Sequence, residues 1–355
     1  MRFIIGCDFH PSYQQIAMFD ERTGELVEKA LRHANQEEVK KFYVGLPAPA
    51  EVGIEASGQT QWFERLLHEL GHRVRIGDAA RIREAAHRKQ KTDRRDAALL
   101  LKLLREGRFP EIWVPTPEER DLRQMLLHRH KLVRMRTQVK NQLQALALNQ
   151  GLQRKRKLWT AAGRAQLEGL AMLPWAARRR KELLQLLDQL NAPIAELDVA
   201  VDQQANTRPE ARRLMTHPGV GPVTGLSFVL TIGPVERFAC SKQISSYLGL
   251  IPSEESSGQR RQRLGHITKQ GSSFLRGVLV EAAQSAVRYE PQLRRHYRRL
   301  AQKKNRGIAK VAIARKLAIR LYWMLRGNLD YAQLIQGSHA GDLESSCGSS
   351  LRPTP

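Results

Sequence analysis

The chain has 355 residues, with 59 lysines and arginines against 35 aspartates and glutamates, and a formal net charge of +24. This excess of positive charge indicates a polyanionic partner such as DNA or RNA. No apolar run approaches the ~20 residues that a spanning helix needs, so the composition excludes an integral membrane protein.

The first residues and the cysteines indicate the cellular compartment in which we expect the protein to work. Residues 2–8 enter a strand-like run at once, without the apolar core and cleavage site of a signal peptide. Cys7, Cys240 and Cys347 have neither metal-binding spacing nor the spacing of a disulfide framework, which suits a reducing environment. We therefore expect a cytoplasmic protein that works at the nucleoid.

Residues 1–112 carry short apolar runs and amphipathic stretches that predict a mixed α/β domain. Predicted strands cover 2–8, 14–20, 25–31, 51–55 and 72–76, and predicted helices cover 60–70 and a stretch that begins at Asp93. A strand, a hairpin, a strand, a helix and a further strand, in this order, match the ribonuclease-H-like scaffold.

Four acids of this domain suit a metal site. Asp8 and Glu55 each close a short apolar strand, whereas Asp93 and Asp96 lie three residues apart, on one face of a helix's first turn. If the strands are neighbours, the four carboxylates form a cluster that cannot all stay ionised without cations. Two magnesium ions held there could clamp the attacking and leaving oxygens of a phosphodiester. The alternative is helix capping and unrelated surface acids.

Residues 113–205 are predicted to form a helical connector with coiled-coil seams. Its apolar side chains recur at spacings of three, four and seven, at Met125, Leu132, Met135, Val139, Leu143 and Leu146, and again at Leu183, Leu187, Leu190, Ile194, Leu197 and Val201. The two seams pack on each other as an antiparallel pair or are shared between subunits. Pro193 predicts a kink or break in the second helix. Between Arg120 and Lys157 there are eleven lysines or arginines and one acid, which favours nucleic-acid contact.

Residues 206–335 form a third, mainly α-helical segment. Gly219 and Gly221 lie in a turn between two helix patterns, like the hairpin of helix-hairpin-helix modules, whose backbone amides hold a phosphate; an ordinary turn is the alternative. Further cations follow in stretches almost free of acids. We expect nucleic-acid contacts from Arg260, Arg261, Arg263, Lys269, Arg276, Lys303, Lys304 and Arg306. The tail, 336–355, is predicted to be disordered.

Several of these stretches together resemble one family. The motifs Gly6-Cys7-Asp8, Gly53–Gly58 and Lys91–Ala97 are similar to the Asp, Glu, Asp, Asp motifs of the insertion-sequence 110 family of transposases. Its second conserved region is similar to His217–Pro222, Tyr247–Pro252, Ser256-Ser257-Gly258 and Gly265–Gly271. The resemblance spans residues 2 to 330, with the motifs in the same order.

The resemblance implies an N-terminal domain like the Holliday-junction resolvase RuvC, a helical connector and a C-terminal transposase domain with a catalytic serine. It implies that Asp8, Glu55, Asp93 and Asp96 hold magnesium and that Ser257 becomes joined to a DNA phosphate, with Ser256 as the alternative nucleophile. It also implies a structured bridge RNA that pairs with donor and target DNA. None of the histidines, including His10, is assigned a catalytic role.

A serine and a metal cluster far apart in the sequence must meet in space, so we expect a homo-oligomer, a dimer or tetramer, with composite active sites. Three alternatives remain. The first is a structure-selective, metal-dependent nuclease in which water attacks and no covalent intermediate forms. The second is a non-catalytic nucleic-acid-binding protein, and the third is a recombinase that works without RNA and reads the major groove.

Overall fold

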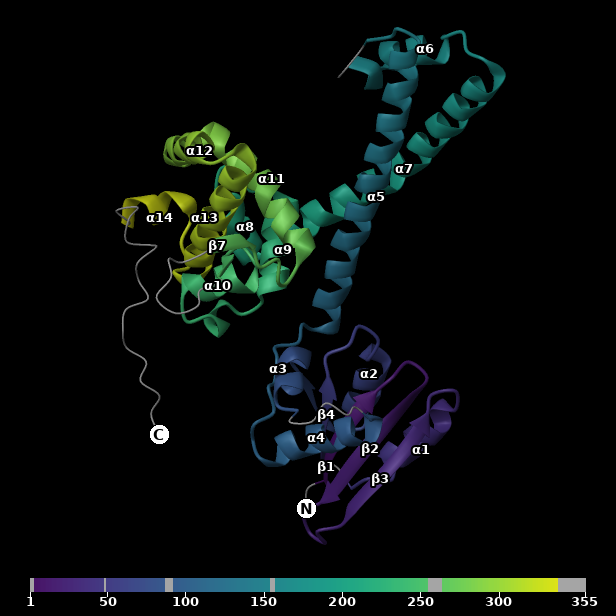
Figure 1. Cartoon of the computed structure of the whole chain (residues 1–355), viewed down its shortest axis with the longest axis vertical. Coiled ribbons are helices and arrows are strands. Elements are labelled where there is room, and N and C mark those ends of the chain that lie inside the picture. Colours follow the sequence, from purple (N-terminus) through teal and green to yellow (C-terminus); the bar gives the residue numbers. More distant parts are fainter. Residues whose placement is uncertain (1–2, 48, 87–91, 154–156, 255–263, 338–355) are drawn as a thin grey trace. The chain divides into compact units, whose positions relative to one another are not determined.

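The computed structural model describes residues 3–47, 49–86, 92–153, 157–254 and 264–337 (Figure 1). The chain forms two compact units, Met1–Val114 (unit 1) and Pro115–Pro355 (unit 2). Unit 1 combines a sheet with helices, and the described part of unit 2 is mostly helical. The predicted order of an α/β region followed by a mainly helical region is therefore confirmed.

Unit 1 is built on a five-stranded sheet in the order β3-β2-β1-β4-β5. The strands are β1 Phe3–Phe9, β2 Tyr13–Asp20, β3 Leu26–Arg32, β4 Ala50–Glu55 and β5 Arg73–Gly77. Strands β1, β2 and β3 are antiparallel neighbours, whereas β1, β4 and β5 run parallel. The five predicted strands are confirmed, with ends shifted by no more than one residue.

Different helices cover the two faces of this sheet. The helices are α1 Gln36–Val44, α2 Gln61–Glu69, α3 Ala79–Glu84 and α4 Asp93–Arg105. Ile5 and Cys7 of β1 join a core with Tyr43 of α1 and Phe63 of α2. Ile4 joins a second core, formed with α3 and α4. Because side chains alternate along a strand, residues 4, 6 and 8 share the face that α4 covers.

Helix α4 lies close to β1 because Gly6 has no side chain. A Cβ on Gly6 would stand 2.2 Å from the carbonyl oxygen of Ala97 and 2.4 Å from the amide nitrogen of Leu101. The helix buries its apolar stripe against the sheet, with Ala97, Leu100, Leu101, Leu103 and Leu104. This docking sets the position of the first turn of α4 relative to β1. The sequence does not predict α1 and α3, because few buried apolar residues mark their inner faces.

Unit 2 begins with a long helical hairpin. Its elements are α5 Pro117–Asn149, the 3₁₀ turn η1 Lys157–Trp159, α6 Ala161–Glu168 and α7 Pro174–Thr207. Helices α5 and α7 lie side by side in opposite directions, with α6 at their far end (Figure 1). Thr116 and Glu119 form a capping box that satisfies backbone N–H groups where α5 begins.

The predicted seams pack on each other within one chain. The buried residues of this interface are Val139, Leu143 and Leu146 from α5 and Leu184, Leu187, Leu190 and Ile194 from α7. Arg129 of α5 also pairs with Asp198 of α7. Helix α7 runs through Pro193, so of the kink or break predicted there the break is excluded. Leu190 and Ile194, on either side of it, are held by packing that compensates for one lost backbone hydrogen bond.

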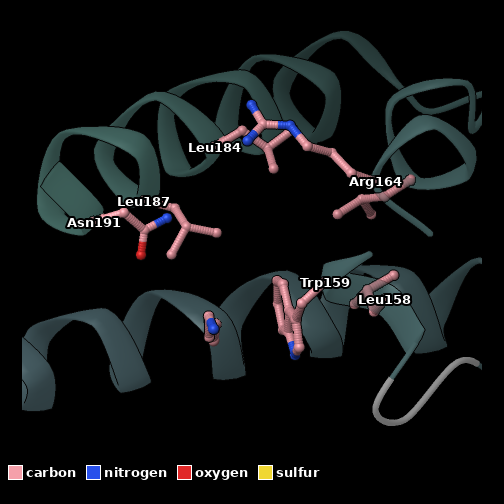
Figure 2. Close-up of a pocket in the computed structure, with 8 residues that line it drawn as sticks. Leu158, Trp159, Arg164, Leu184, Leu187 and Asn191 are labelled. Atoms are coloured by element: carbon pink, nitrogen blue, oxygen red, sulfur yellow. The ribbon is translucent and has the colours of Figure 1, made fainter. Parts of the chain in front are cut away.

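A small hollow of about 100 Å³ lies between α5 and α7 beside η1 (Figure 2). Leu158 and Trp159 line it from η1, and Leu184 and Leu187 line it from α7. At its edge, Arg164 forms hydrogen bonds to Asp188 at 2.5 and 2.6 Å and to Glu168 at 2.8 Å. None of the described residues that line the hollow is acidic, so it offers no carboxylate for phosphoryl-transfer chemistry.

The rest of unit 2 is a helical core with a short two-stranded sheet. Its helices are α8 Pro209–Met215, α9 Pro222–Ile232, η2 Val235–Arg237, α10 Ser241–Tyr247, α11 Ser273–Tyr289, α12 Pro291–Lys303, α13 Arg306–Arg326 and α14 Tyr331–Gly337, and its strands are β6 Pro252–Glu254 and β7 Leu264–Ile267. Helix α13 buries Ile313, Leu317 and Leu321 at the centre. Residues 338–355, most of the predicted tail, lie outside the described residues. None of the described helices is both long enough and apolar enough to cross a membrane.

Candidate active site

Two of the predicted acids lie at the carboxyl ends of adjacent strands of the unit 1 sheet, Asp8 in β1 and Glu55 in β4. Strands β1 and β4 are parallel, with Cys7 opposite Ile54. Asp8 and Glu55 come directly after this pair, at the carboxyl ends of the two strands. Gly53 packs against α4 side chains, so the alternation of β4 directs Glu55 to the face that α4 covers. Asp8 and Glu55 therefore leave the sheet at the same edge and on the same face.

Helix α4 supplies the other two acids. Asp93 is its first residue, and Asp96 belongs to the same first turn, as their spacing predicts. The unpaired N–H groups at a helix N-terminus favour negative charge nearby, which suits carboxylates at these positions. The pair is thus placed by the docking of α4 on β1 and supported by the dipole of α4.

Asp8 and Asp93 come together around a histidine. Asp8, His10 and Asp93 each offer one ligand atom, and these atoms all lie within 4.8 Å of one another. The Nε2 atom of His10 is 3.1 Å from Oδ2 of Asp8 and 3.7 Å from Oδ1 of Asp93. The Asp8 side chain is 14% exposed, against 43% for Asp93, so Asp8 is the more buried member of this group.

Tyr13 holds this group from the start of β2. Its hydroxyl donates a hydrogen bond to Oδ2 of Asp93, and its ring stacks on His10 with centroids 4.8 Å apart. The hydrogen bond to Asp93 raises the pKa of the Tyr13 phenol, so the phenol stays protonated and remains a donor. One side chain therefore positions both the histidine and the helix-borne carboxylate.

The negative charges around Asp8 affect the pKa of its carboxyl group. Burial raises the pKa of Asp8 above its ordinary value, and the charges of Asp96 and Asp93 raise it further. His10 opposes this rise through its charge and its hydrogen bond to Asp8. A cation among these oxygens would relieve the same repulsion. The donor set and its electrostatics thus fit a divalent metal ion.

His10 and Tyr13 are site residues that sequence reasoning missed. The signal in the sequence is the alternation of β1, since His10 lies two residues after Asp8 and shares its face of the sheet. For Tyr13 the signal is weaker, because its contact with Asp93 joins residues 80 positions apart in the sequence. Only the docking of α4 brings the two side chains together.

Unit 2 carries a basic groove of about 880 Å³ between the β6–β7 sheet and helices α12 and α13. Its cationic lining consists of Lys242, Lys304, Arg315 and Lys316, and two histidines, His266 and His296, join them. None of the described residues that line it is acidic. Such a groove is electrostatically suited to a phosphodiester strand.

The predicted catalytic segment follows β6. Strands β6 and β7 pair antiparallel, with Pro252 opposite Ile267 and Glu254 opposite Leu264. Residues of both strands line the basic groove. Several predicted site residues lie between these strands in the sequence and outside the described residues. They are Ser256, Ser257, Arg260, Arg261 and Arg263.

The other predicted nucleic-acid contacts divide into two kinds. Lys269, Lys303, Lys304 and Arg306 are exposed, and Lys304 lines the groove. Arg276 is half-buried and donates hydrogen bonds to the backbone carbonyls of Leu248 and Gln270, so it holds the segment before α11. The guanidinium of Arg276 therefore forms hydrogen bonds within the protein, whereas the exposed cations present their charge to solvent.

The two glycines between α8 and α9 also differ. Gly219 has a φ of +88°, and a Cβ there would stand 2.5 Å from the amide nitrogen of Ala286 in α11. Gly221, which precedes α9, has no atom within 4 Å of the same position. Gly219 thus permits close packing of the turn on α11, while Gly221 leaves the start of α9 open.

Comparison with known proteins identifies the family of this chain. A relative from Pseudomonas aeruginosa, described as a probable family 20 transposase, is 31% identical over 333 residues, which cover 90% of this chain and 96% of the relative. The model of the transposase IS116/IS110/IS902 family matches residues 211–298, and the family's DEDD transposase model matches residues 5–150. The chain belongs to this family of transposases.

Other relatives of this transposase come from different bacteria. The transposase for insertion sequence element IS1111A from Coxiella burnetii is 25% identical over 293 residues, covering 81% of this chain and 78% of the relative. A pilin gene-inverting protein from Moraxella lacunata is 32% identical over 149 residues, covering 40% of this chain and 46% of the relative.

The two matched regions of the transposase include the acid site of unit 1 and part of the basic groove of unit 2. Residues 5–150 include the four acids together with His10 and Tyr13. Residues 211–298 include β6, β7, α11 and the segment that carries Ser257. Family membership makes the protein a DNA-recombining enzyme of an insertion sequence, and the DEDD match implies use of a divalent metal.

Proposed function

We propose that this transposase cuts and exchanges DNA strands with magnesium held by Asp8, Glu55, Asp93 and Asp96. The observation that carries the proposal is the convergence of Asp8 and Asp93 at one edge of the sheet, within the region that matches DEDD transposases. The strand order β3-β2-β1-β4-β5 supports a ribonuclease-H-like, RuvC-like domain over residues 1–112, followed by the connector at 113–205 and the transposase domain at 206–335.

The residues of unit 1 prepare the site for metal and substrate. Asp8 supplies a buried carboxylate whose negative charge is already crowded by Asp93 and Asp96. Tyr13 fixes the orientation of Asp93 through its hydrogen bond, and α4 carries Asp96 three residues further along, in the same first turn. When bound, two magnesium ions would supply Lewis acidity at the scissile phosphate and stabilise negative charge on the leaving oxygen.

We assign the nucleophile to Ser257, with Ser256 as the alternative. In this step the serine hydroxyl loses its proton and its oxygen bonds to the DNA phosphorus, while the bond from phosphorus to one bridging oxygen breaks and that oxygen takes up a proton to leave as a DNA hydroxyl. We assign phosphate binding to Arg260, Arg261 and Arg263, which follow the serine closely in the sequence. The neighbouring groove, whose cations include Lys304 and Arg315, supports the path of a strand past this segment.

Strand exchange, rather than simple cleavage, is supported by one relative. The Moraxella lacunata protein is described as inverting a pilin gene, and inversion requires that DNA be rejoined after it is cut. Exchange between two DNA molecules also needs more than one cutting centre, so we propose a homo-oligomer, a dimer or tetramer. Apolar side chains that stay exposed on the hairpin, among them Met135, Leu173, Trp175 and Val199, support such association.

A structured guide RNA from the ends of the element completes the proposal. The described basic residues on α5, α12 and α13 supply positive charge that suits the phosphates of RNA as well as those of DNA. We propose that RNA binds part of this charge, pairs with donor and target DNA, and directs the enzyme in the cytoplasm at the nucleoid.

To test this proposed function, purified protein is mixed with magnesium, RNA transcribed from the element's ends, and labelled donor and target DNA. We expect a protein–DNA adduct that survives denaturation and requires RNA, Asp93 and Ser257. Ser257→Ala and Asp93→Asn should lack it, while Ser256→Ala, the matched control, should retain it. Cleavage that needs Asp93 but gives no adduct would establish the nuclease alternative. Binding of DNA with no reaction in any condition would favour the non-catalytic alternative, and an adduct without RNA would favour a recombinase that needs no guide.

A further inference from the structure

His10 lies just beyond β1 and shares a face of the sheet with Asp8. Its Nε2 atom is 3.1 Å from Asp8 and 3.7 Å from Asp93, and the three ligand atoms all lie within 4.8 Å of one another. We propose that His10 is a ligand of the metal ion that Asp8 and Asp93 bind, and that it favours manganese over magnesium at this position. The inference rests on the metal site of the proposed function.

The separations match those of ligands around one ion. With bond lengths of ~2.1 Å, neighbouring ligands of an octahedral ion are about 3.0 Å apart and opposite ligands about 4.2 Å apart. The distances of Nε2 to the two carboxylate oxygens, 3.1 and 3.7 Å, fall inside this interval. The three side chains could therefore contact one ion after shifts of a few tenths of an ångström.

The imidazole is held in this orientation from two sides. Tyr13 stacks on its ring at an interplanar angle of 21°, while the Tyr13 hydroxyl holds Asp93. The backbone is fixed as well, since the amide of His10 donates to the carbonyl of Tyr13 at 2.9 Å and thereby closes the β1–β2 turn.

The turn itself is anchored to the end of β3. The amide of His33 donates to the carbonyl of Ser12 at 2.9 Å, and the His33 ring lies 3.2 Å from the carbonyl oxygen of Pro11. A ligand on such a fixed turn needs little ordering when the ion binds.

An imidazole ligand has a consequence for metal preference. Magnesium binds oxygen ligands and keeps its waters, whereas manganese accepts carboxylate oxygens and is also bound more tightly than most hard ions by nitrogen donors. A centre with His10 among its ligands should therefore prefer manganese over magnesium more strongly than a centre of carboxylates alone. The second ion of the proposed pair, held by the remaining carboxylates, has no such preference.

Pulsed electron paramagnetic resonance on the full chain loaded with manganese tests the inference. We expect a modulation from a directly bound imidazole nitrogen, lost in His10→Asn and kept in His68→Asn, whose histidine is exposed on α2 and outside the ligand group. Titration should show manganese affinity about 10-fold lower in His10→Asn, with a smaller change for magnesium. Circular dichroism confirms that each variant is folded.

The outcomes separate the two proposals. Manganese binding that requires Asp93 but shows no nitrogen modulation, or a modulation unchanged in His10→Asn, would overturn the role of His10 and leave the metal site in place. If neither manganese nor magnesium bound in a way that Asp93→Asn weakens, the metal site of the proposed function would be overturned together with this inference.

Discussion

The two candidate sites of the transposase use charge in opposite ways. Unit 1 gathers negative charge within a few ångströms, on residues fixed by a sheet, a docked helix and a stacked tyrosine. Unit 2 spreads positive charge along a groove of about 880 Å³, mostly on long side chains. Metal binding depends on the exact positions of a few ligands, so the loss of one ligand has a large effect. The affinity for a nucleic-acid strand is instead the sum of many small contributions from single cations.

The largest effect should come from Asp93→Asn, which removes one carboxylate charge and keeps the size of the side chain. Because even residues that only support metal ligands contribute 10–100-fold, we expect strand cleavage to fall by more than ~100-fold. Cleavage of labelled DNA measures this, and thermal unfolding serves as the check on the fold. Activity within tenfold of wild type would show that the acids of unit 1 do not form the reaction centre.

Acidification should destabilise unit 2 through His217, which is 1% exposed. Burial lowers its pKa to about 4, while in the unfolded chain it returns to its ordinary value. The unfolded state therefore takes up the proton first, and stability present above pH ~6.5 is lost as the pH falls towards 4, by roughly 3 kcal/mol in total. Denaturant unfolding at several pH values measures the loss.

His217→Phe is the matched variant for this measurement, because it keeps a ring beside Tyr331, whose centroid is 4.4 Å away, and removes the titration. We expect its stability to change much less over the same interval. An equal slope in both proteins would mean that other groups of unit 2 control the response to acid.

Gly6→Ala should weaken the packing of α4 on β1, on which the acid site depends. The new methyl group would press on the backbone of α4 at Ala97 and Leu101, so we expect a loss of stability of about 1–3 kcal/mol or more. Gly58→Ala is the control, since its Cβ would meet no atom within 4 Å. If both variants unfold at the same denaturant concentration as wild type, α4 is not held by this contact.

Tyr13→Phe removes one hydrogen bond from the acid site and keeps the stacked ring. We expect metal affinity to fall by about 10–100-fold, because Asp93 loses the donor that orients it. Calorimetric titration of the metal measures the change. Tyr289→Phe, an exposed tyrosine of α11, should bind metal as wild type does. Equal affinity in both variants would show that Tyr13 does not position Asp93.

The smallest effect should come from single cations of the groove. Lys304→Gln should weaken DNA binding by about fivefold near 0.15 M salt and lower the salt slope by about one, as expected for one lost phosphate contact. Arg178→Gln, which removes a cation already paired with Glu182, should leave affinity almost unchanged. If the two substitutions weaken binding equally, net charge alone controls DNA affinity and the groove has no special part in it.

Local patterns in the sequence carry much of this architecture. The apolar run that begins at Phe3 predicts the strand whose carboxyl end carries Asp8, and the three-residue spacing of Asp93 and Asp96 predicts their shared helical turn. Repeats of three and four predict the seams of α5 and α7. Each of these signals extends over a few neighbouring residues, because hydrogen bonding within a strand or helix fixes the period of its side chains.

The sequence by itself thus determined the strands, the long helices, the basic character and the acids of this protein. Only the tertiary structure decided that His10 lies between Asp8 and Asp93, that Tyr13 holds His10 and Asp93, and that Gly219 packs on α11. These contacts depend on how closely one element approaches another, as at Gly6, where the absence of a side chain admits α4. Such distances follow from the packing of residues far apart in the chain, which no local period encodes.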